Sequence, residues 1–325
     1  MRRSEAYRAL TGWLNEARDV ALVCHVSPDG DTLGSALALK LALEKLRKRV
    51  RVVCQDVAPA MYLALPGAME IVPAQAYDEY PDIVLFLDIS SPERAGTARA
   101  LMSRARRSAC VDHHARAERF AQLTLADTGA AATGVLVFQL IRLLGVALDY
   151  QIALCLYTAV ATDTGNFAFS NTDPRAFRLA AKCVALELPV AELTMRYFTE
   201  RTPAGIALLG RALCALTYYD GGAIAVMRLT EADFAASGAT KDDEEGFINI
   251  ALAVKGVAVA VYMRVRGDEV KCSLRSRASV DVARAAKELG GGGHAQAAGV
   301  TLDMSMEEAL SRVLAKLRQQ MRTGE

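Results

Sequence analysis

All four histidines of this 325-residue chain stand beside aspartates or glycines. They are His25, His113, His114 and His294. Imidazole nitrogens together with carboxylate oxygens are typical ligands of hard or borderline divalent cations. A chain that uses histidine so sparingly, and only in such surroundings, is predicted to use it for chemistry. The aspartates near three of them indicate metal binding.

The first such segment, HVSPDGD, follows an apolar run and contains His25, Asp29 and Asp31. In an extended chain the two aspartates, two positions apart, would project to the same side. Gly30 between them permits a backbone twist that a side chain would prevent, and the helix expected next would turn its positive end toward them. PDGD is also ordinary turn sequence, and Asp31 could simply cap that helix. Metal ligand and turn therefore remain alternatives at this point.

Two further segments place polar side chains directly after apolar runs. Asp88 follows IVLFL, where a lone aspartate could equally be a loop cap. In VDHHAR, the adjacent His113 and His114 would point in different directions, so that one could bind metal while the other faces substrate. Asp112 could then fix the tautomer of a histidine ring. The alternative for VDHHAR is a polar strand end on the surface.

A fourth segment, YTAVATDTGNF, places Asp163 at the end of an apolar helix, where the alternative is a helix C-cap with Gly165 in the left-handed conformation. A structural zinc site would favour clustered thiolates, and no cysteine competes with the ligands proposed here. Ligands rich in aspartate suit two divalent ions that share a bridging carboxylate, Mn²⁺ first, with Mg²⁺ or Co²⁺ as alternatives. Two ions about 4 Å apart clamp a phosphoryl group and activate a hydroxide for attack. The candidate metal ligands are His25, Asp29, Asp31, Asp88, His113 and Asp163.

The first half of the chain alternates strand-like and helix-like patterns, which predicts an α/β domain with a doubly wound, mainly parallel sheet. Ligands of such sheets bind outside the carboxyl ends of the strands. His25, Asp88 and the group from Asp112 to His114 all fall at those ends. The expected strands are 19–26, 50–55, 82–90 and 108–114, and the expected helices are 33–48, 92–105, 133–145 and 149–162.

The second half changes character after a helical stretch over 173–214. Hairpins are expected over 215–230 and 257–276, the second turning at 266–269. With helices expected over 242–255, 281–289 and 305–321, this is a smaller α+β domain with antiparallel strands. The predicted organisation is a metal-binding domain over 1–190, a helical connector over 191–214 and a substrate-binding domain over 215–325.

The composition narrows the class of protein. A net charge of +1 gives no global electrostatic footprint for long duplex nucleic acid, although it allows a local basic pocket. We find no apolar signal-peptide core and no apolar run long enough to span a membrane. The seven cysteines are scattered without CxxC pairing, which favours small core side chains in a reducing cytoplasm.

HVSPDGD, LDIS, VDHH and ATDTG, in this order, resemble the motifs of the DHH phosphoesterase superfamily, and GGGGHAQAAG (290–299) resembles the glycine-rich signature of its DHHA1-type C-terminal domain. The resemblance implies a parallel-sheet domain carrying two metals, a linker, and a smaller substrate-binding domain, with the active site in the cleft between them. It also assigns the ligands: His25 and Asp29 to one metal, Asp31, His113 and Asp163 to the other, and Asp88 as the bridge. His114 would face the phosphate and stabilise developing charge, and Asp112 would orient a histidine.

The second domain would hold the nucleotide. Consecutive glycines give backbone N–H groups close access to an anion, whereas the alternative, a helix C-cap and loop, would not need four of them. Arg264 could equally be a solvated strand residue. Ala168 stands where many relatives carry an arginine, and Ser27 where many carry an asparagine. The residues expected to contact substrate are Asn166, Arg264, Arg275, Ser276, Gly291, Gly292, Gly293 and His294.

Within the superfamily, the chain resembles the short, stand-alone bifunctional oligoribonucleases that also remove the 3′-phosphate of adenosine 3′,5′-bisphosphate. This resemblance implies a cytoplasmic Mn²⁺-dependent exonuclease and phosphatase acting on short single-stranded RNA or small nucleotides. A homodimer is the oligomeric state that we consider for it. Stand-alone cyclic-di-AMP or linear pApA phosphodiesterases have nearly the same layout and are the alternative. A nucleotide-binding regulator that has lost catalysis is the second alternative.

Overall fold

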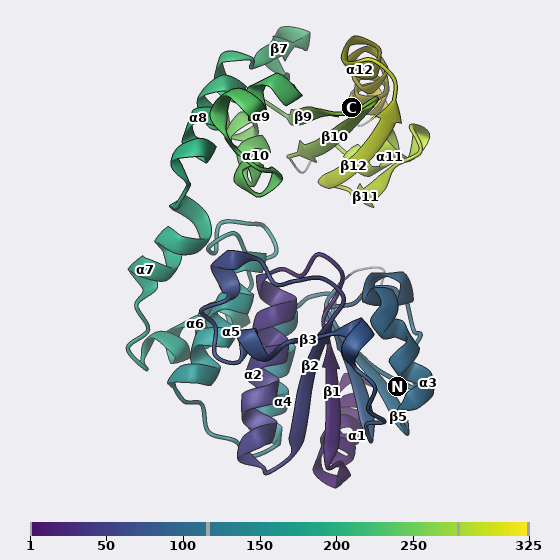
Figure 1. Ribbon diagram of the computed structural model, residues 1–325, viewed down its shortest axis with the longest axis vertical. Helices are drawn as coiled ribbons and strands as arrows, with labels where there is room; N and C mark the ends of the chain where they lie inside the picture. Colours follow the sequence, from purple (N-terminus) through teal and green to yellow (C-terminus); the bar gives the residue numbers. More distant parts are fainter. Residues whose placement is uncertain (1, 115–117, 278–279, 324–325) are drawn as a thin grey trace. The chain divides into compact units, whose positions relative to one another are not determined.

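The computed structural model describes residues 2–114, 118–277 and 280–323. The chain forms two compact units, Met1–Glu200 and Arg201–Glu325 (Figure 1). The boundary falls within the segment 191–214 that is expected to connect the domains. That segment contains the end of helix α7 (Val190–Thr194), a π-helical turn (Met195–Thr199) and helix α8 (Pro203–Cys214).

The first unit is built on a six-stranded sheet in the order β3-β2-β1-β4-β5-β6, and every neighbouring pair is parallel. This confirms the predicted doubly wound sheet. Its apolar central strands are buried on both faces, as parallel sheets require. The edge strands β3 and β6 go beyond the four strands expected from the sequence. The strands are β1 (Asp19–Val23), β2 (Arg49–Cys54), β3 (Val72–Pro73), β4 (Ile83–Leu87), β5 (Arg107–Asp112) and β6 (Leu123–Ala126).

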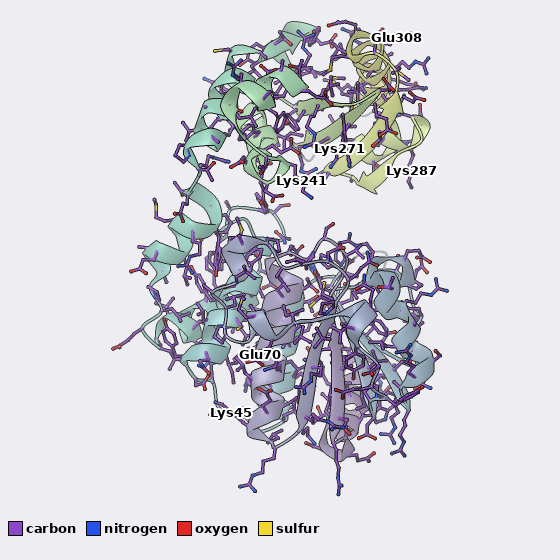
Figure 2. The ribbon with its side chains drawn as sticks, viewed as in Figure 1. Lys45, Glu70, Lys241, Lys271, Lys287 and Glu308 are labelled. Atoms are coloured by element: carbon purple, nitrogen blue, oxygen red, sulfur yellow. The ribbon has the colours of Figure 1, made fainter. Side chains whose placement is uncertain are left out.

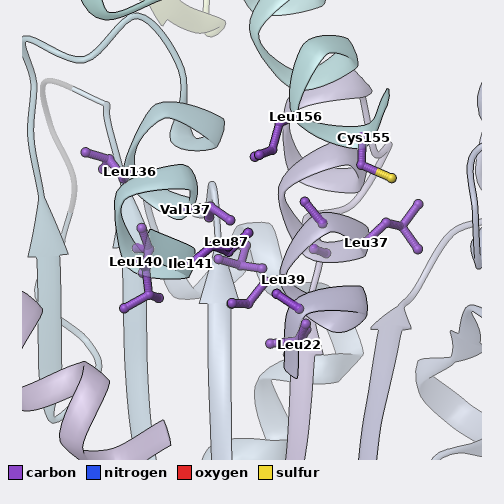
Figure 3. Packing of buried hydrophobic residues seen from close by; sticks show 14 of the residues in the cluster. Leu22, Leu37, Leu39, Leu87, Leu136, Val137, Leu140, Ile141, Cys155 and Leu156 are labelled. Carbon is purple, nitrogen blue, oxygen red and sulfur yellow. The ribbon is translucent and has the colours of Figure 1, made fainter. Parts of the chain in front are cut away.

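Helices cover both faces of this sheet (Figure 1). On one face, Leu22 of β1 and the residue that ends β4, Leu87, share a core with side chains such as Leu39 and Ile141 (Figure 3). On the other face, Phe86 packs against a 3₁₀ segment (Pro92–Ala100) and helix α3. The α-helices of this unit are α1 (Arg3–Glu16), α2 (Gly30–Lys45), α3 (Leu101–Arg104), α4 (Thr133–Leu143), α5 (Tyr150–Asp163), α6 (Pro174–Val184) and α7.

The helix expected over 92–105 is interrupted. Residues Pro92–Ala100 form 3₁₀ turns that break at Gly96, where φ is 55°, and only the last residues form the short α3. Gly96 lies so close to Gln55 that an added Cβ would come within 2.3 Å of its Oε1. The same Gln55 oxygen accepts a hydrogen bond from the Thr97 backbone N–H over 2.8 Å. This contact with the chain that follows β2 prevents a regular helix.

The second unit contains a six-stranded sheet in the order β11-β12-β10-β9-β8-β7. Both predicted hairpins are present, as β7–β8 and β9–β10. The antiparallel pairing expected for this domain does not extend to β8 and β9, which pair in parallel because helices α9 (Glu231–Ser237) and α10 (Phe247–Ala253) form a crossover between them. The strands are β7 (Thr217–Tyr219), β8 (Ile224–Leu229), β9 (Val259–Arg266), β10 (Glu269–Ser276), β11 (Gly292–His294) and β12 (Ala297–Asp303).

Helices pack on both faces of this second sheet as well. The segment expected as one helix over 242–255 divides at Gly246, which has a positive φ, into a 3₁₀ turn (Lys241–Glu244) and α10. The other helices beside α8 are α9 (Glu231–Ser237), α10 (Phe247–Ala253), α11 (Val282–Glu288) and α12 (Met306–Thr323). In the described ranges, every helix is too short or too polar to cross a membrane.

Candidate metal centre

The six candidate ligands converge at the carboxyl edge of the first sheet. His25 follows β1 and Asp88 follows β4, the two neighbouring strands at which the strand order reverses. Such a switch point is where doubly wound sheets form a crevice for ligands. The others come from the start of α2, the end of β5 and the end of α5: Asp29, Asp31, His113 and Asp163.

Asp29 and Asp31 take different roles because α2 begins between them. Asp29 is the N-cap of α2, and its Oδ1 accepts the backbone N–H groups of Asp31 and Thr32 over 3.1 Å each. Asp31 lies in the first turn of the helix, so it is not the cap. The expectation that an extended chain would project both carboxylates to one side is therefore wrong, and the two side chains join different groups of ligands.

The first group is His25, Asp29 and Asp88, whose ligand atoms lie within 4.8 Å of one another. His25 Nε2 lies 3.4 Å from Asp29 Oδ2 and 3.6 Å from Asp88 Oδ2. The His25 and Asp88 side chains are buried, whereas Asp29 is 55% exposed. This group therefore opens to solvent on the side of Asp29.

The second group is Asp31, His113 and Asp163. His113 Nε2 lies 3.9 Å from Asp31 Oδ2 and 3.5 Å from Asp163 Oδ2. The same nitrogen lies 3.5 Å from the second oxygen of Asp88, Oδ1. The two oxygens of Asp88 thus face different groups of ligands, which is the arrangement that a carboxylate bridging two cations requires.

The N-terminus of α4 holds two of these carboxylates in place. The backbone N–H groups of Thr133 and Gly134 donate to Asp31 over 2.6 and 2.9 Å, and Ser35 Oγ donates to it over 3.1 Å. The Thr133 hydroxyl donates to Asp88 Oδ1 over 2.9 Å. A helix N-terminus favours a carboxylate. The sequence predictions missed Thr133, although it is the first residue of an apolar helix and its backbone N–H is one of those that a helix leaves without a partner.

The two adjacent histidines are oriented by different acceptors. His113 Nδ1 lies 3.1 Å from the carbonyl of Ala130, so an Nδ1–H donated there leaves Nε2 free to face the carboxylates. His114 Nδ1 lies 2.7 Å from Asp112 Oδ1. Asp112 is fully buried, and its Oδ2 has no hydrogen-bond partner in the described part of the chain. The histidine that Asp112 orients is therefore His114.

Crowding shifts the pKa values of the carboxylates in opposite directions. Burial, followed by repulsion from Asp88 and Asp163, raises the pKa of Asp31 well above its usual range. Burial raises the pKa of Asp163 to about 6, against the attraction of His113. Burial also opposes ionisation of Asp88, but the hydrogen bond from His25 and the positive field of the other histidines outweigh it and lower its pKa to about 2.

The histidines hold protons more tightly than usual. Burial lowers the pKa of His25, but hydrogen bonds with Asp29 and Asp88 outweigh burial and raise the pKa to about 9. Burial also opposes protonation of His114, and the hydrogen bond with Asp112 outweighs it and raises the pKa to about 9. Both rings are therefore protonated at neutral pH in the absence of a metal.

These residues fit hard or borderline divalent cations. The donors are carboxylate oxygens and imidazole nitrogens, and each possible group in the described ranges contains only Asp and His. Burial and then repulsion from neighbouring carboxylates already raise the pKa values of Asp31 and Asp163, so a cation bound beside them would relieve an existing electrostatic cost. Cys24 lies nearby but its Sγ contacts the Thr32 carbonyl instead.

The turn after α5 is wrapped around Asp163. Gly165, Asn166 and Phe167 all have positive φ, at 55°, 55° and 65°. Asn171 Nδ2 returns to within 3.0 Å of the Asp163 carbonyl and 3.2 Å of Asp163 Oδ2. These hydrogen bonds from Asn171 hold the carboxylate beside His113, and the substrate contact predicted for Asn166 stays a prediction. Asn171 is a further residue that the sequence predictions missed.

In the second unit, Arg275 is a partly buried cation on β10. Its nearest hydrogen-bond acceptor is the Leu274 carbonyl at 3.2 Å, and no carboxylate lies within ion-pair distance among the described residues. Burial lowers the pKa of Arg275. Lys271 is exposed on the same strand (Figure 2), and the alternation of a strand places it on the same face as Arg275. A cation that is desolvated without a counter-charge is suited to an anionic ligand.

The other residues expected to hold substrate have structural contacts. Ser276 Oγ donates to the Val280 carbonyl over 2.5 Å. Arg264 forms a buried ion pair with Glu244, with 2.6 Å between Nη1 and Oε1, so it is not a solvated strand residue. Tyr262 donates to the other Glu244 oxygen, also over 2.6 Å. A substrate contact by Arg264 or Ser276 stays a prediction and would have to share these partners.

The glycine run forms an edge strand rather than a loop. Gly290 follows α11 with a φ of 88°, and its N–H bonds the Lys287 carbonyl, as at a helix C-terminus. An added Cβ on Gly291 would come within 2.2 Å of the Gly299 carbonyl, and one on Gly293 within 2.4 Å of the Ala297 carbonyl. These glycines are therefore needed for close pairing of β11 with β12. Anion binding by Gly291, Gly292 and Gly293 stays a prediction, and the His294 side chain lies outside the described part.

Comparisons with known proteins connect both units to described families. The N-terminal domain of the DHH family matches residues 19–160, and the DHHA1 domain matches residues 221–323. The "bifunctional oligoribonuclease and PAP phosphatase NrnA" of Thermus thermophilus is 33% identical over 314 residues, which cover 93% of this chain and 90% of that protein. The crystal structure of an exopolyphosphatase-related protein from Bacteroides fragilis superposes with a TM-score of 0.93 at 27% identity, covering 99% of this chain and 98% of that one.

A more distant relative has a different described activity. The "cyclic-di-AMP phosphodiesterase PdeA" of Listeria monocytogenes is 24% identical over 343 residues. The match covers 95% of this chain but only 49% of that protein. The Thermus relative therefore resembles this chain over about nine-tenths of its own length, whereas the Listeria protein resembles it over about half of its own.

Proposed function

The chain belongs to the DHH family of phosphoesterases and carries a DHHA1 domain, and we propose that it hydrolyses short oligoribonucleotides and adenosine 3′,5′-bisphosphate. One observation carries the proposal: the two oxygens of Asp88 face two separate groups of Asp and His ligands. This geometry suits two divalent cations, Mn²⁺ first, on a phosphate. The resemblance to the Thermus oligoribonuclease and phosphatase supplies the substrates.

The ligand groups would each hold one cation, with Asp88 shared. When bound, the two cations supply positive charge to the phosphate oxygens and activate water for attack on phosphorus. The protein orients its own ligands beforehand. His113 turns Nε2 inward through the Ala130 carbonyl, Asp31 is held by the N-terminus of α4, and Asp163 is held by Asn171. Little reorganisation then accompanies the reaction.

His114 would act on the phosphate directly. Its Nδ1–H is donated to Asp112, so in the protonated ring Nε2–H remains available for a phosphate oxygen or for the leaving oxygen. The raised pKa keeps the ring charged at neutral pH, and the buried Asp112 carboxylate maintains that charge. The pair would therefore neutralise negative charge that develops on the phosphate.

Arg275 would bind the nucleotide end of the substrate. An arginine without a carboxylate partner can give its donors to a phosphate in a bidentate manner. Lys271, four residues earlier on the same strand face, would attract a second phosphate. Two basic side chains on one strand face favour an anionic substrate.

Turnover of cyclic di-AMP is a second candidate, favoured by the resemblance to the Listeria phosphodiesterase. Its chemistry would use the same ligands and differ only in the nucleotide that the second unit accepts. If the protein hydrolyses no phosphate ester, it would instead be a nucleotide-binding protein without catalysis. A cytoplasmic location, supported by seven free thiols of which six are buried, and a homodimer are proposed with the function.

The decisive experiment compares kcat/KM in Mn²⁺ on four substrates: a two-to-five-nucleotide RNA, adenosine 3′,5′-bisphosphate, cyclic di-AMP and linear pApA. Preference for the first two supports the proposal, and preference for cyclic di-AMP supports the second candidate. Asp88→Ala and Asp163→Ala should abolish turnover. Asp268→Asn, in the exposed turn between β9 and β10, is the matched control and should retain it. Unchanged activity of Asp88→Ala would refute the metal assignment.

A further inference from the structure

Arg94 places a guanidinium beside one of the candidate metal ligands. It lies in the exposed 3₁₀ segment after β4, and its Nη2 is 2.9 Å from His25 Nδ1. The backbone there is anchored to the chain after β1, because the Val26 N–H donates to the Arg94 carbonyl over 2.8 Å. Gly96 and Gln55 fix the same turn from the other side. The arginine therefore has a fixed base and a long, movable side chain at the rim of the ligand cluster.

The contact with His25 does not satisfy the Arg94 guanidinium as a hydrogen-bond donor. Nδ1 also lies 2.9 Å from the Val26 carbonyl, which it can reach only as an N–H donor. Arg94 can donate to Nδ1 only when that nitrogen carries no hydrogen, so the two bonds are alternatives. Nε2 faces Asp29 and Asp88 and must offer a lone pair to a metal. The hydrogen sits on Nδ1 in that state, as it also does in the protonated ring, so Nδ1 offers the guanidinium no acceptor in either state.

No carboxylate of the described chain offers the Arg94 guanidinium an ion-pair partner. Ion-pair partners within 4.0 Å are found for its neighbour Arg99, which lies 3.7 Å from Glu93, but not for Arg94. A planar guanidinium released beside a cluster built for phosphate chemistry matches a phosphate oxygen in charge and geometry. We propose that Arg94 turns away from His25 when the metals bind and contacts a non-bridging oxygen of the substrate phosphate. This inference rests on the proposed function.

The test separates substrate binding from metal binding. The first measurement is the affinity of the Mn²⁺-loaded protein for AMP, a product that the proposed reactions release and do not consume. The second is Mn²⁺ affinity, from the electron paramagnetic resonance signal of free Mn²⁺. The variants are Arg94→Ala and Arg94→Lys, with Arg99→Ala from the same exposed segment as matched control.

Arg94→Ala should weaken AMP binding by about 10- to 100-fold, the range for a lost charge-assisted hydrogen bond. Its Mn²⁺ affinity should stay equal to or exceed that of the wild type, because a positive charge beside the ligand cluster is removed. Arg94→Lys should recover part of the AMP affinity, and guanidinium ions added to Arg94→Ala should recover part of the turnover. Arg99→Ala should change neither affinity.

Two results would overturn the inference. The first is an unchanged AMP affinity in Arg94→Ala. The second is a loss of Mn²⁺ affinity in that variant large enough to explain its loss of AMP affinity. The second would make Arg94 a positioning residue for His25. Failure of the proposed function is distinguishable from both. If the wild-type protein binds AMP through Arg94 but hydrolyses none of the four substrates, this inference stands and the proposed function is refuted.

Discussion

The hydroxyl of Thr133 donates a hydrogen bond to Asp88 Oδ1 over 2.9 Å, across 45 residues of sequence. The partner is the carboxylate that faces both ligand groups. Thr133→Val keeps the shape and the backbone N–H but removes this donor, so Asp88 can rotate. We expect kcat to fall about 10- to 100-fold, as for other supports of metal ligands. Thr133→Ser should retain most of the activity, and equal kcat values for the two variants would show that the hydroxyl is not needed.

The Asp112–His114 pair predicts a change in pH dependence. Burial opposes protonation of His114, but the hydrogen bond that its Nδ1–H donates to Asp112 outweighs burial and raises the pKa to about 9. If protonated His114 assists the reaction, activity should decline as pH rises through about 9. Asp112→Asn removes the negative charge, lowers the pKa of His114 and moves that decline to lower pH. A pH–rate profile of both proteins measures the shift, and coincident alkaline limbs would exclude a role for the His114 proton.

Metal binding should release protons. The pKa of metal-free His25 is about 9, so at pH 7.5 a cation must displace its proton, and metal affinity should rise with pH up to about 9. Calorimetric titration with Mn²⁺ in two buffers of different ionisation enthalpy measures the release. His25→Asn should reduce it, whereas His114→Gln, which changes a histidine not assigned as a ligand, should leave the His25 contribution in place. Buffer-independent heats for the wild type would contradict this prediction.

Arg275 and Arg277 should respond to alanine substitution in opposite ways. Arg275 is desolvated without a carboxylate partner, so Arg275→Ala should weaken nucleotide binding while leaving the melting temperature unchanged or higher. Arg277 donates to the Val257 and Leu252 carbonyls over 2.8 and 3.0 Å. Arg277→Ala should destabilise the protein by about 1 to 2 kcal/mol. Thermal unfolding and the KM for a dinucleotide, measured for both variants, distinguish the two roles. A change of KM in Arg277→Ala but not in Arg275→Ala would contradict the assignment of Arg275 to nucleotide binding.

Gly34 controls the distance between the two helices that carry Asp31 and Asp163. An added Cβ would come within 2.4 Å of the Cys155 carbonyl on α5. Gly34→Ala should therefore destabilise the protein by about 1 to 3 kcal/mol and reduce activity through misplaced ligands. Gly12→Ala, in α1 with no atom within 4 Å of the new Cβ, should stabilise by about 0.5 to 1 kcal/mol. Denaturant unfolding of both variants checks the contrast.

Much of the fold follows from short-range pattern. Apolar runs of strand length that alternate with apolar helices predict a parallel sheet, and the carboxyl ends of parallel strands share one edge. Polar residues that directly follow such runs, as His25, Asp88 and His113 do, must therefore lie near one another. Boundaries were less accurate: Gly96 interrupts an expected helix because of Gln55, which belongs to another part of the chain.

The pairing of ligands and their supports was decided by the tertiary structure. Asp29 and Asp31 separate because α2 starts between them, and that start depends on the cap formed by Asp29. The hydrogen bond from Thr133 to Asp31 and the contact between Arg94 and His25 span 102 and 69 residues. A sequence pattern with a period of two or 3.6 residues carries no information over such separations.

The same distinction applies to the second unit. A run of glycines after a helix indicates a special backbone, and the sequence determined that much. Only the tertiary structure shows that Gly291 and Gly293 allow close pairing with β12, because the atoms that exclude a Cβ belong to Gly299 and Ala297. In this protein the sequence by itself determined which chemical groups reach the edge of the first sheet. The folded chain decided which of them touch, because hydrogen bonds and steric exclusion act between residues that the sequence keeps far apart.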